Sequence, residues 1–423
     1  MHLVSFLLPF LLQLHLQSVA SPISKHLERG SRLSLCSDED DIAETNDAPT
    51  GNNPPGIGVE FETATITLKS EDCSEKNVLA AKSKTINGRK GKNWALTADI
   101  LSEGTLDAEY VLDGKSIKLN SGSAKEAAEA VAKDINDWDP HEDGKEVTID
   151  NNPCTWKISG PKEKKGGHSY TWAPQVTAPL PLAGLYDLLG KYVAKTHSAL
   201  LPNRRQKPMI HVTKDFFQSK PNGLDSGSVE DDVLGFFSLI MSFAKASSAN
   251  PNEPIEEDES LKELTVIMPR TDFTSIYHSV KSSIPGDLYP IVKTLACYKN
   301  NGDDVELDTD FCSGTVEDPS PNGNMDKQRF AVFPAGGDYE EVKVEKWIKS
   351  MQNGPAPDAL TKLDKKMDSA IGGVGDSMEN ILGSDTLVPL FEFRRLRRTK
   401  TDDLPAFVSE AEEEIVKYHK SAK

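Results

Sequence analysis

The sequence lacks the short motifs that mark the common nucleotide-binding and hydrolytic enzymes. It contains no GxGxxG after a candidate strand, no GxxxxGK[ST], no HExxH and no GxSxG. A glycine cluster at positions 372–375 has no lysine after it, so we interpret it as a break between two helices rather than a phosphate loop. These absences exclude the simplest assignments to an enzyme class.

Cysteine is scarce, and no two cysteines form a CxxC pair, which argues against a zinc or redox site. Cys297 and Cys312 flank a polar loop, and closing a loop of about 15 residues stabilises a fold by roughly 3 kcal/mol in the chain-entropy model. We therefore predict a Cys297–Cys312 disulfide. Cys73 and Cys154 then pair by elimination, which leaves Cys36 as the odd thiol; a different pairing stays open.

Positive charge is also scarce, with 48 Lys and Arg against 66 Asp and Glu among 423 residues, and a formal net charge of -18. Such a surface repels nucleic acid and anionic membranes, so neither is an expected partner. Hydrophobic residues make up 37% of the chain, enough to build a proper core. We expect a monomer.

No hydrophobic run is long enough to span a membrane, which takes about 20 residues. The apolar run at positions 3–16 is followed by Ser18-Val19-Ala20, which is typical of a secretory signal cleaved after Ala20. We therefore expect a secreted, extracellular protein. Residues 1–20 are the predicted signal, 21–55 a disordered acidic leader, and 56–423 a single large domain.

Candidate strands lie mostly early in the chain and candidate helices mostly late, without regular βαβ alternation. This order favours an α+β fold, a mostly antiparallel sheet with helices packed on it. The predicted strands are 57–68, 94–100, 108–112, 209–212, 264–268 and 387–393. The predicted helices are 123–138, 182–200, 229–246, 274–282, 289–297, 342–352, 359–382 and 407–419.

The main chemical lead is the segment Gly58-Val59-Glu60-Phe61-Glu62. Side chains two apart on a strand share a face, so the two carboxylates can bind one divalent cation while Val59 and Phe61 face the core. The alternative is a half-buried strand with two solvent-facing glutamates. Further candidates, each beside an apolar segment, are Asp99, Glu109, His211, Arg270, Glu392 and Arg394.

In this order and context the set resembles the glutamine synthetase and glutamate-cysteine ligase superfamily, nearest its putative amidoligase branch. The resemblance implies a fold of that type. It also implies that Mg²⁺ and ATP are cofactors, with metal ligands at Glu60, Glu62, Glu109 and Glu392. His211 would lie beside them, and Arg270 and Arg394 would contact the transferring phosphoryl group, with Arg394 binding the nucleotide. Thr213 stands where that family commonly has a second histidine, and an isolated core histidine is the alternative interpretation of His211.

A second resemblance covers the whole chain. It rests on the stretches 56–63, 93–113, 216–243, 267–277, 297–312 and 389–394, which resemble an uncharacterised family of secreted proteins from pathogenic and insect-associated ascomycete fungi. This resemblance implies an association with virulence. The basic run at 394–400 is interpreted as a solvated loop rather than a nuclear-import signal.

Three hypotheses follow. The favoured one is a secreted fungal effector or toxin-like protein that binds a host protein or small molecule on a ligase-like fold without turnover. The second is an active ATP- and Mg²⁺-dependent carboxylate-amine ligase delivered into a host cell, and the third is a secreted structural or storage protein. If the ligase resemblance is right, Glu60, Glu62 and Glu392 lie on adjacent strands with their side chains on one face.

Overall fold

The structure is a computed structural model that describes residues 54–102, 105–137, 144–160, 170–202, 209–247, 266–302, 304–332, 340–353 and 378–422. The predicted signal, nearly all of the predicted leader, Cys36 and the glycine cluster at 372–375 lie outside these residues. So does most of the predicted helix 359–382. Its last residues form a strand instead, β15 (Met378–Asn380).

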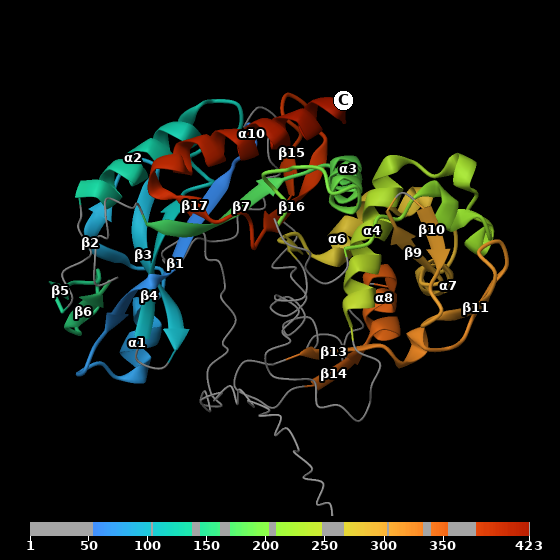
Figure 1. Ribbon diagram of the computed structural model, residues 1–423, viewed down its shortest axis with the longest axis horizontal. Coiled ribbons are helices and arrows are strands. Elements are labelled where there is room, and N and C mark those ends of the chain that lie inside the picture. Colours follow the sequence, from blue (N-terminus) through green and yellow to red (C-terminus); the bar gives the residue numbers. More distant parts are fainter. Residues whose placement is uncertain are drawn as a thin grey trace, which may run out of the picture.

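A large antiparallel sheet forms one half of the protein, as Figure 1 shows. Its main path runs β15-β16-β7-β1-β4-β3-β2, and the described residues contribute eleven strands to it in all. These strands are β1 (Gly58–Lys69), β2 (Thr85–Lys90), β3 (Trp94–Ser102), β4 (Thr105–Leu112), β5 (Glu146–Val147), β6 (Trp156–Ser159), β7 (Thr171–Pro179), β8 (Ile267–Pro269), β15, β16 (Leu387–Phe393) and β17 (Thr399–Lys400). The predicted α+β class with an antiparallel sheet is confirmed.

Two helices cover the apolar face of this sheet, α2 (Ser123–Asp137) and α10 (Leu404–Ser421), which lie against each other in Figure 1. Phe61 of β1 pairs in register with Tyr110 of β4, so the two side chains share this face. The Tyr110 hydroxyl donates to Asp134 of α2 at 2.7 Å, which fixes α2 on the same side. Strand alternation therefore directs Glu60 and Glu62 to the opposite face.

The second half of the protein is mainly helical and surrounds α4 (Asp231–Ala246), in which every residue from Val233 to Ala244 is buried. The other helices of this half are α3 (Leu182–Val193), α6 (Phe273–Val280), α7 (Leu288–Leu295) and α8 (Val344–Asn353). Its short hairpins are β9 (Tyr298–Asn301) with β10 (Asp304–Leu307), β11 (Cys312–Gly314) with β12 (Pro319–Pro321), and β13 (Arg329–Val332) with β14 (Glu340–Lys343). The short helix α1 (Glu75–Ala81) lies near β3 in the sheet half.

Two disulfides link Cys73 to Cys154 and Cys297 to Cys312, with Cα atoms 5.3 and 5.1 Å apart. These are the two pairs expected from the sequence. The first bridge joins the segment before α1 to the segment before β6, and the second closes the loop that contains β9 and β10. None of the helices in the described residues has the length and apolar character needed to cross a membrane.

Two further predicted elements differ from the structure. Residues 209–212 are not a strand: the N–H groups of Ile210 and Val212 donate to the hydroxyls of Ser242 and Ser238 on α4, at 2.8 and 2.9 Å. The predicted helix 182–200 ends at Val193, because residues 194–200 turn towards α10, where the Ala199 N–H donates to Glu414 at 3.0 Å.

The central strand β7 was missed altogether. It contains Pro174, and proline is rare inside central strands because it has no N–H to donate. In the structure β17 pairs with Thr171 and Trp172, whereas β16 pairs with the residues from Val176 onward. Pro174 falls between these two pairings, where no strand on that side needs its missing N–H.

The packing of α3 against α4 predicts the effect of one substitution. A Cβ at Gly235 would overlap the carbonyl oxygen of Leu182, which is backbone and cannot rotate away. Gly235→Ala should therefore lower the free energy of unfolding by about 1–3 kcal/mol in chemical denaturation. Gly227→Ala, at an exposed glycine with open space around it, is the matched control and should be nearly neutral. Equal stability of the two variants would contradict the close approach of the helices.

An acidic sheet face as the candidate functional site

Three glutamates meet on the sheet face opposite α2 and α10. Glu62 of β1 pairs directly with Glu109 of β4, and Glu60 lies two residues before Glu62 on the same face. One carboxylate oxygen from each of Glu60, Glu62 and Glu109 lies within 4.8 Å of the other two. The alternation of β1 and its register with β4 are therefore sufficient to build this cluster.

The cluster has the chemistry of a hard-cation site. Its donors are all carboxylate oxygens, which Mg²⁺, Mn²⁺ and Ca²⁺ prefer over nitrogen or sulfur. Two oxygens that bind one such ion at about 2.1 to 2.5 Å lie at most about 4 to 5 Å apart. The spacing in the cluster satisfies this limit, so Glu60, Glu62 and Glu109 fit a single divalent cation.

Burial and the repulsion of neighbouring carboxylates raise the pKa of each of these carboxyls. The pKa of Glu60 is well above its ordinary value, first because of burial and then because of Glu109, Glu392 and Glu62. Burial, with Asp99 and Glu62, raises the pKa of Glu109 to about 8. Burial raises the pKa of Glu62, whereas a hydrogen bond from Gln175 and the charge of Arg394 lower it by less.

The acidic character continues along β3 and β4. Asp99 pairs in register with Asp107, and burial together with Asp99 and Glu62 raises the pKa of Asp107 to about 7. Lys82 forms an ion pair with Asp99 at 2.9 Å, and the Thr97 hydroxyl donates to Glu109 at 3.1 Å. The face thus holds more carboxylates than the nearby cations can neutralise, which favours binding of protons or of a cation.

Glu392 lies on the same face but not on a strand adjacent to β1. Its register partner is Thr177 of β7, two residues from Gln175, which pairs with Glu60. The expected adjacency of the two motif strands is therefore wrong, because β7 lies between β1 and β16. The shared face is as expected.

Two arginines accompany Glu392. Strand β8 pairs with β16 so that Met268 is opposite Glu392, and Arg270 follows at the end of β8. Arg270 forms an ion pair with Glu392, and Arg394 Nε lies 3.2 Å from Glu392 Oε1. The charge of Arg270 lowers the pKa of Glu60, although burial and the neighbouring carboxylates raise it by more. Arg270 and the glutamate cluster therefore belong to one electrostatic site.

His211 is not brought to this face. Its ring packs on Tyr186 of α3 with 4.4 Å between centroids, and its backbone N–H donates to Asn300 of β9 at 3.0 Å. Burial alone lowers the pKa of His211 to about 4, so the ring is neutral at physiological pH. His211 is half-buried against α3 and β9, and its Nε2 has no hydrogen-bond partner among the described residues. These contacts agree better with the alternative, an isolated histidine packed in the core, than with a place beside the glutamates.

Sequence reasoning missed Gln175, Asp107 and Lys82. Gln175 was missed together with β7, and Asp107 lies just before the predicted strand 108–112. A signal for Asp107 was available, because it lies two residues before Glu109. A strand extended to include both residues places their side chains on one face, as β4 does. Lys82 follows α1, and nothing in the sequence indicated its contact with Asp99.

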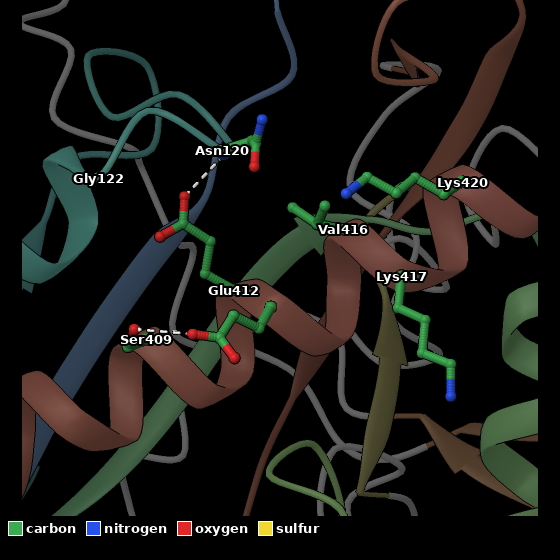
Figure 2. A pocket seen from close by; sticks show the side chains of 8 residues that line it. Asn120, Gly122, Ser409, Glu412, Val416, Lys417 and Lys420 are labelled. Carbon is green, nitrogen blue, oxygen red and sulfur yellow. Dashed lines mark hydrogen bonds between the residues drawn. The ribbon is translucent and has the colours of Figure 1, made fainter.

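A separate cavity of about 410 Å³ lies between the start of α2 and α10, on the helical side of the sheet (Figure 2). Its wall includes Lys417 and Lys420, which could attract an anion. However, the Glu412 carboxylate already accepts a hydrogen bond from the Asn120 N–H at 2.7 Å, as Figure 2 shows. The Asn120 N–H near the start of α2 is thus occupied from within the protein.

Comparisons of the chain with family models, curated proteins and solved structures gave no match. The function is therefore argued from the geometry of the acidic face.

The raised pKa values predict how stability depends on pH in EDTA. A carboxyl near pKa 8 in the folded state and near 4.5 in the unfolded state keeps its proton longer when folded. Its favourable contribution is complete below pH 4.5 and is lost as the pH rises through 8. Since one pKa unit corresponds to about 1.4 kcal/mol, the metal-free protein should lose on the order of a few kcal/mol between pH 5 and 8.5.

Chemical denaturation at pH 5, 6.5 and 8.5 checks this expectation. Glu109→Gln should flatten the pH dependence, and added Mn²⁺ should restore stability at pH 8.5 in the parent but much less in the variant. A parent protein that becomes more stable in EDTA as the pH rises would contradict the arrangement of these carboxyls.

Proposed function

We propose that the chain is a divalent-cation-dependent enzyme of the ATP-dependent carboxylate-amine ligase type. The observation that supports it is the gathering on one sheet face of three carboxylates from β1 and β4 with two arginines beside β16. These residues come from four separate places in the chain: β1, β4, the end of β8 and the end of β16. A merely solvent-exposed acidic face would not need two partly buried arginines beside it.

Glu60, Glu62 and Glu109 would hold the cation through carboxylate oxygens. A bound Mg²⁺ would neutralise the charge of nucleotide phosphates and polarise the transferring group. The Arg270 and Arg394 guanidiniums would donate N–H groups to the oxygens of the transferring phosphoryl group, where negative charge is spread in the transition state. Because Arg270 is 10% exposed, its charge is poorly screened by water, and its interaction with such an anion is strengthened.

The second candidate is the effector hypothesis, in which the same face binds a host protein or small molecule without turnover. The position of His211 supports it, because the face lacks the histidine that a ligase of this type would carry there. Thr213, at the place of a second histidine, belongs to the same segment. The two candidates share the cation site and differ in whether ATP is consumed.

We also propose that the protein is secreted and associated with virulence. The signal-like segment at 3–20 supports secretion, and so do the two disulfides, which persist in oxidising compartments. The resemblance to secreted proteins of pathogenic fungi supports the association with virulence. A ligase would then need delivery into a host cell, because ATP is scarce outside cells.

Calorimetry of the mature protein with Mg·ATP tests the proposal. The parent should bind Mg·ATP. Glu60→Gln should weaken this binding, and Arg394→Ala should slow any ATP consumption by about 10²-fold, the scale of a lost transition-state donor. Glu129→Gln, at an exposed position on α2, is the control for loss of one negative charge and should behave as the parent.

Two outcomes separate the candidates. Binding of Mg·ATP without consumption in the presence of ammonia, amines and amino acids would favour the effector hypothesis. No heat from the parent at millimolar nucleotide would overturn the ligase proposal.

A further inference from the structure

We propose that Glu392 is a positioning residue rather than a cation ligand, and that it holds Arg270 and Arg394 together as an anion receptor beside the cation site. This inference rests on the proposed function, since it assigns the second half of the same site. It departs from the role that the ligase resemblance implies for Glu392.

The position of Glu392 separates it from the cation cluster. The three carboxylates close enough to share an ion are Glu60, Glu62 and Glu109, and Glu392 is not among them. A whole strand, β7, separates β16 from β1. Neighbouring strands lie about 4.8 Å apart, so carboxylates two strands apart on one face start nearly 10 Å apart at the backbone.

The contacts of Glu392 are with guanidiniums. Its side chain is 1% exposed, and its two oxygens face different arginines, Oε2 towards Arg270 and Oε1 towards Arg394. A cation bound at Glu392 would have to break both ion pairs and would leave two partly buried guanidiniums without their carboxylate. Breaking a buried pair in this way is strongly unfavourable.

The arginines keep binding capacity beyond Glu392. Two guanidiniums share one carboxylate, so the trio carries one excess positive charge. The Arg270 side chain is 10% exposed, and its Nε atom is buried without a hydrogen-bond partner among the described residues. Buried polar groups are nearly always hydrogen-bonded, so this N–H is available to donate to an oxygen of a bound anion.

The chemistry of this receptor defines its ligand class as an oxyanion, a phosphoryl or carboxylate group. The guanidinium of arginine binds such groups through two parallel N–H donors. Because the arginine side chain is long, it must be held in place to bind well. Glu392 lies on β16, which pairs with β7 on one side and β8 on the other. Its carboxylate can therefore hold both guanidiniums in place.

The test separates cation binding from anion binding by using MnCl₂ and inorganic pyrophosphate as probes. Calorimetry is done with each probe alone and with both together, on the parent, Glu392→Gln and Glu60→Gln. Glu392→Gln should keep the parent affinity for Mn²⁺ within about threefold. It should weaken pyrophosphate binding by about 10- to 100-fold, the range of lost charge-assisted hydrogen bonds. Glu60→Gln should do the reverse: it should weaken Mn²⁺ binding and keep metal-free pyrophosphate binding.

Glu392→Asp serves as the rescue variant and as the substitute if Glu392→Gln does not fold. It keeps the charge but is one methylene shorter, so it should restore part of the pyrophosphate affinity and leave Mn²⁺ binding unchanged. A loss of Mn²⁺ affinity in either Glu392 variant as large as in Glu60→Gln would overturn the inference and make Glu392 a cation ligand. Unchanged pyrophosphate binding in both variants would overturn it as well.

Failure of the proposed function gives a different pattern. A parent protein that binds pyrophosphate, in a manner dependent on Glu392, but no Mn²⁺ would overturn the cation site and leave the receptor standing. A parent that binds neither probe would overturn both.

Discussion

The site depends on one electrostatic constraint, the repulsion between carboxylates that the sheet holds together on a poorly hydrated face. Glu62 is directly opposite Glu109, and Glu60 lies beside them, so the charges of Glu62 and Glu109 raise the pKa of Glu60 and the charge of Glu62 raises the pKa of Glu109. Protons or a divalent cation relieve this repulsion. The pKa shifts and the expected effect of Mn²⁺ on stability both follow from it.

Packing on the opposite face of the sheet stabilises the register of β1 and β4 that brings these carboxylates together. Phe61 and Tyr110 are fully buried under the helical layer, and a slip of β1 by one residue would expose Phe61 and bury Glu60 and Glu62. The hydrophobic core thus fixes the carboxylates in an arrangement that they would not adopt alone. Stability from one face supports a strained arrangement on the other, as is common at functional sites.

The sequence predicted those elements and side-chain directions that depend on a local pattern of residues. Alternation in β1 predicted the strand and the common face of Glu60 and Glu62. An apolar run predicted β16, and helical patterns located α2, α4 and α10. It did not predict contacts between residues that are distant in the chain, or elements whose local pattern is atypical. Pro174 concealed β7, the strand that separates Glu60 from Glu392, and His211 on an apolar segment has a neutral, buried environment away from the acidic face. Only the tertiary pairing shows that Glu392 contacts arginines rather than the glutamate cluster.

The central claim is that Glu60, Glu62 and Glu109 bind one divalent cation. The most direct test is an anomalous difference map from crystals of the mature protein grown with Mn²⁺. The account predicts one strong peak on the acidic face, about 2.0 to 2.4 Å from an oxygen of each of the three glutamates. A peak coordinated by Glu392, or no peak on this face at saturating Mn²⁺ and pH 8, would contradict it.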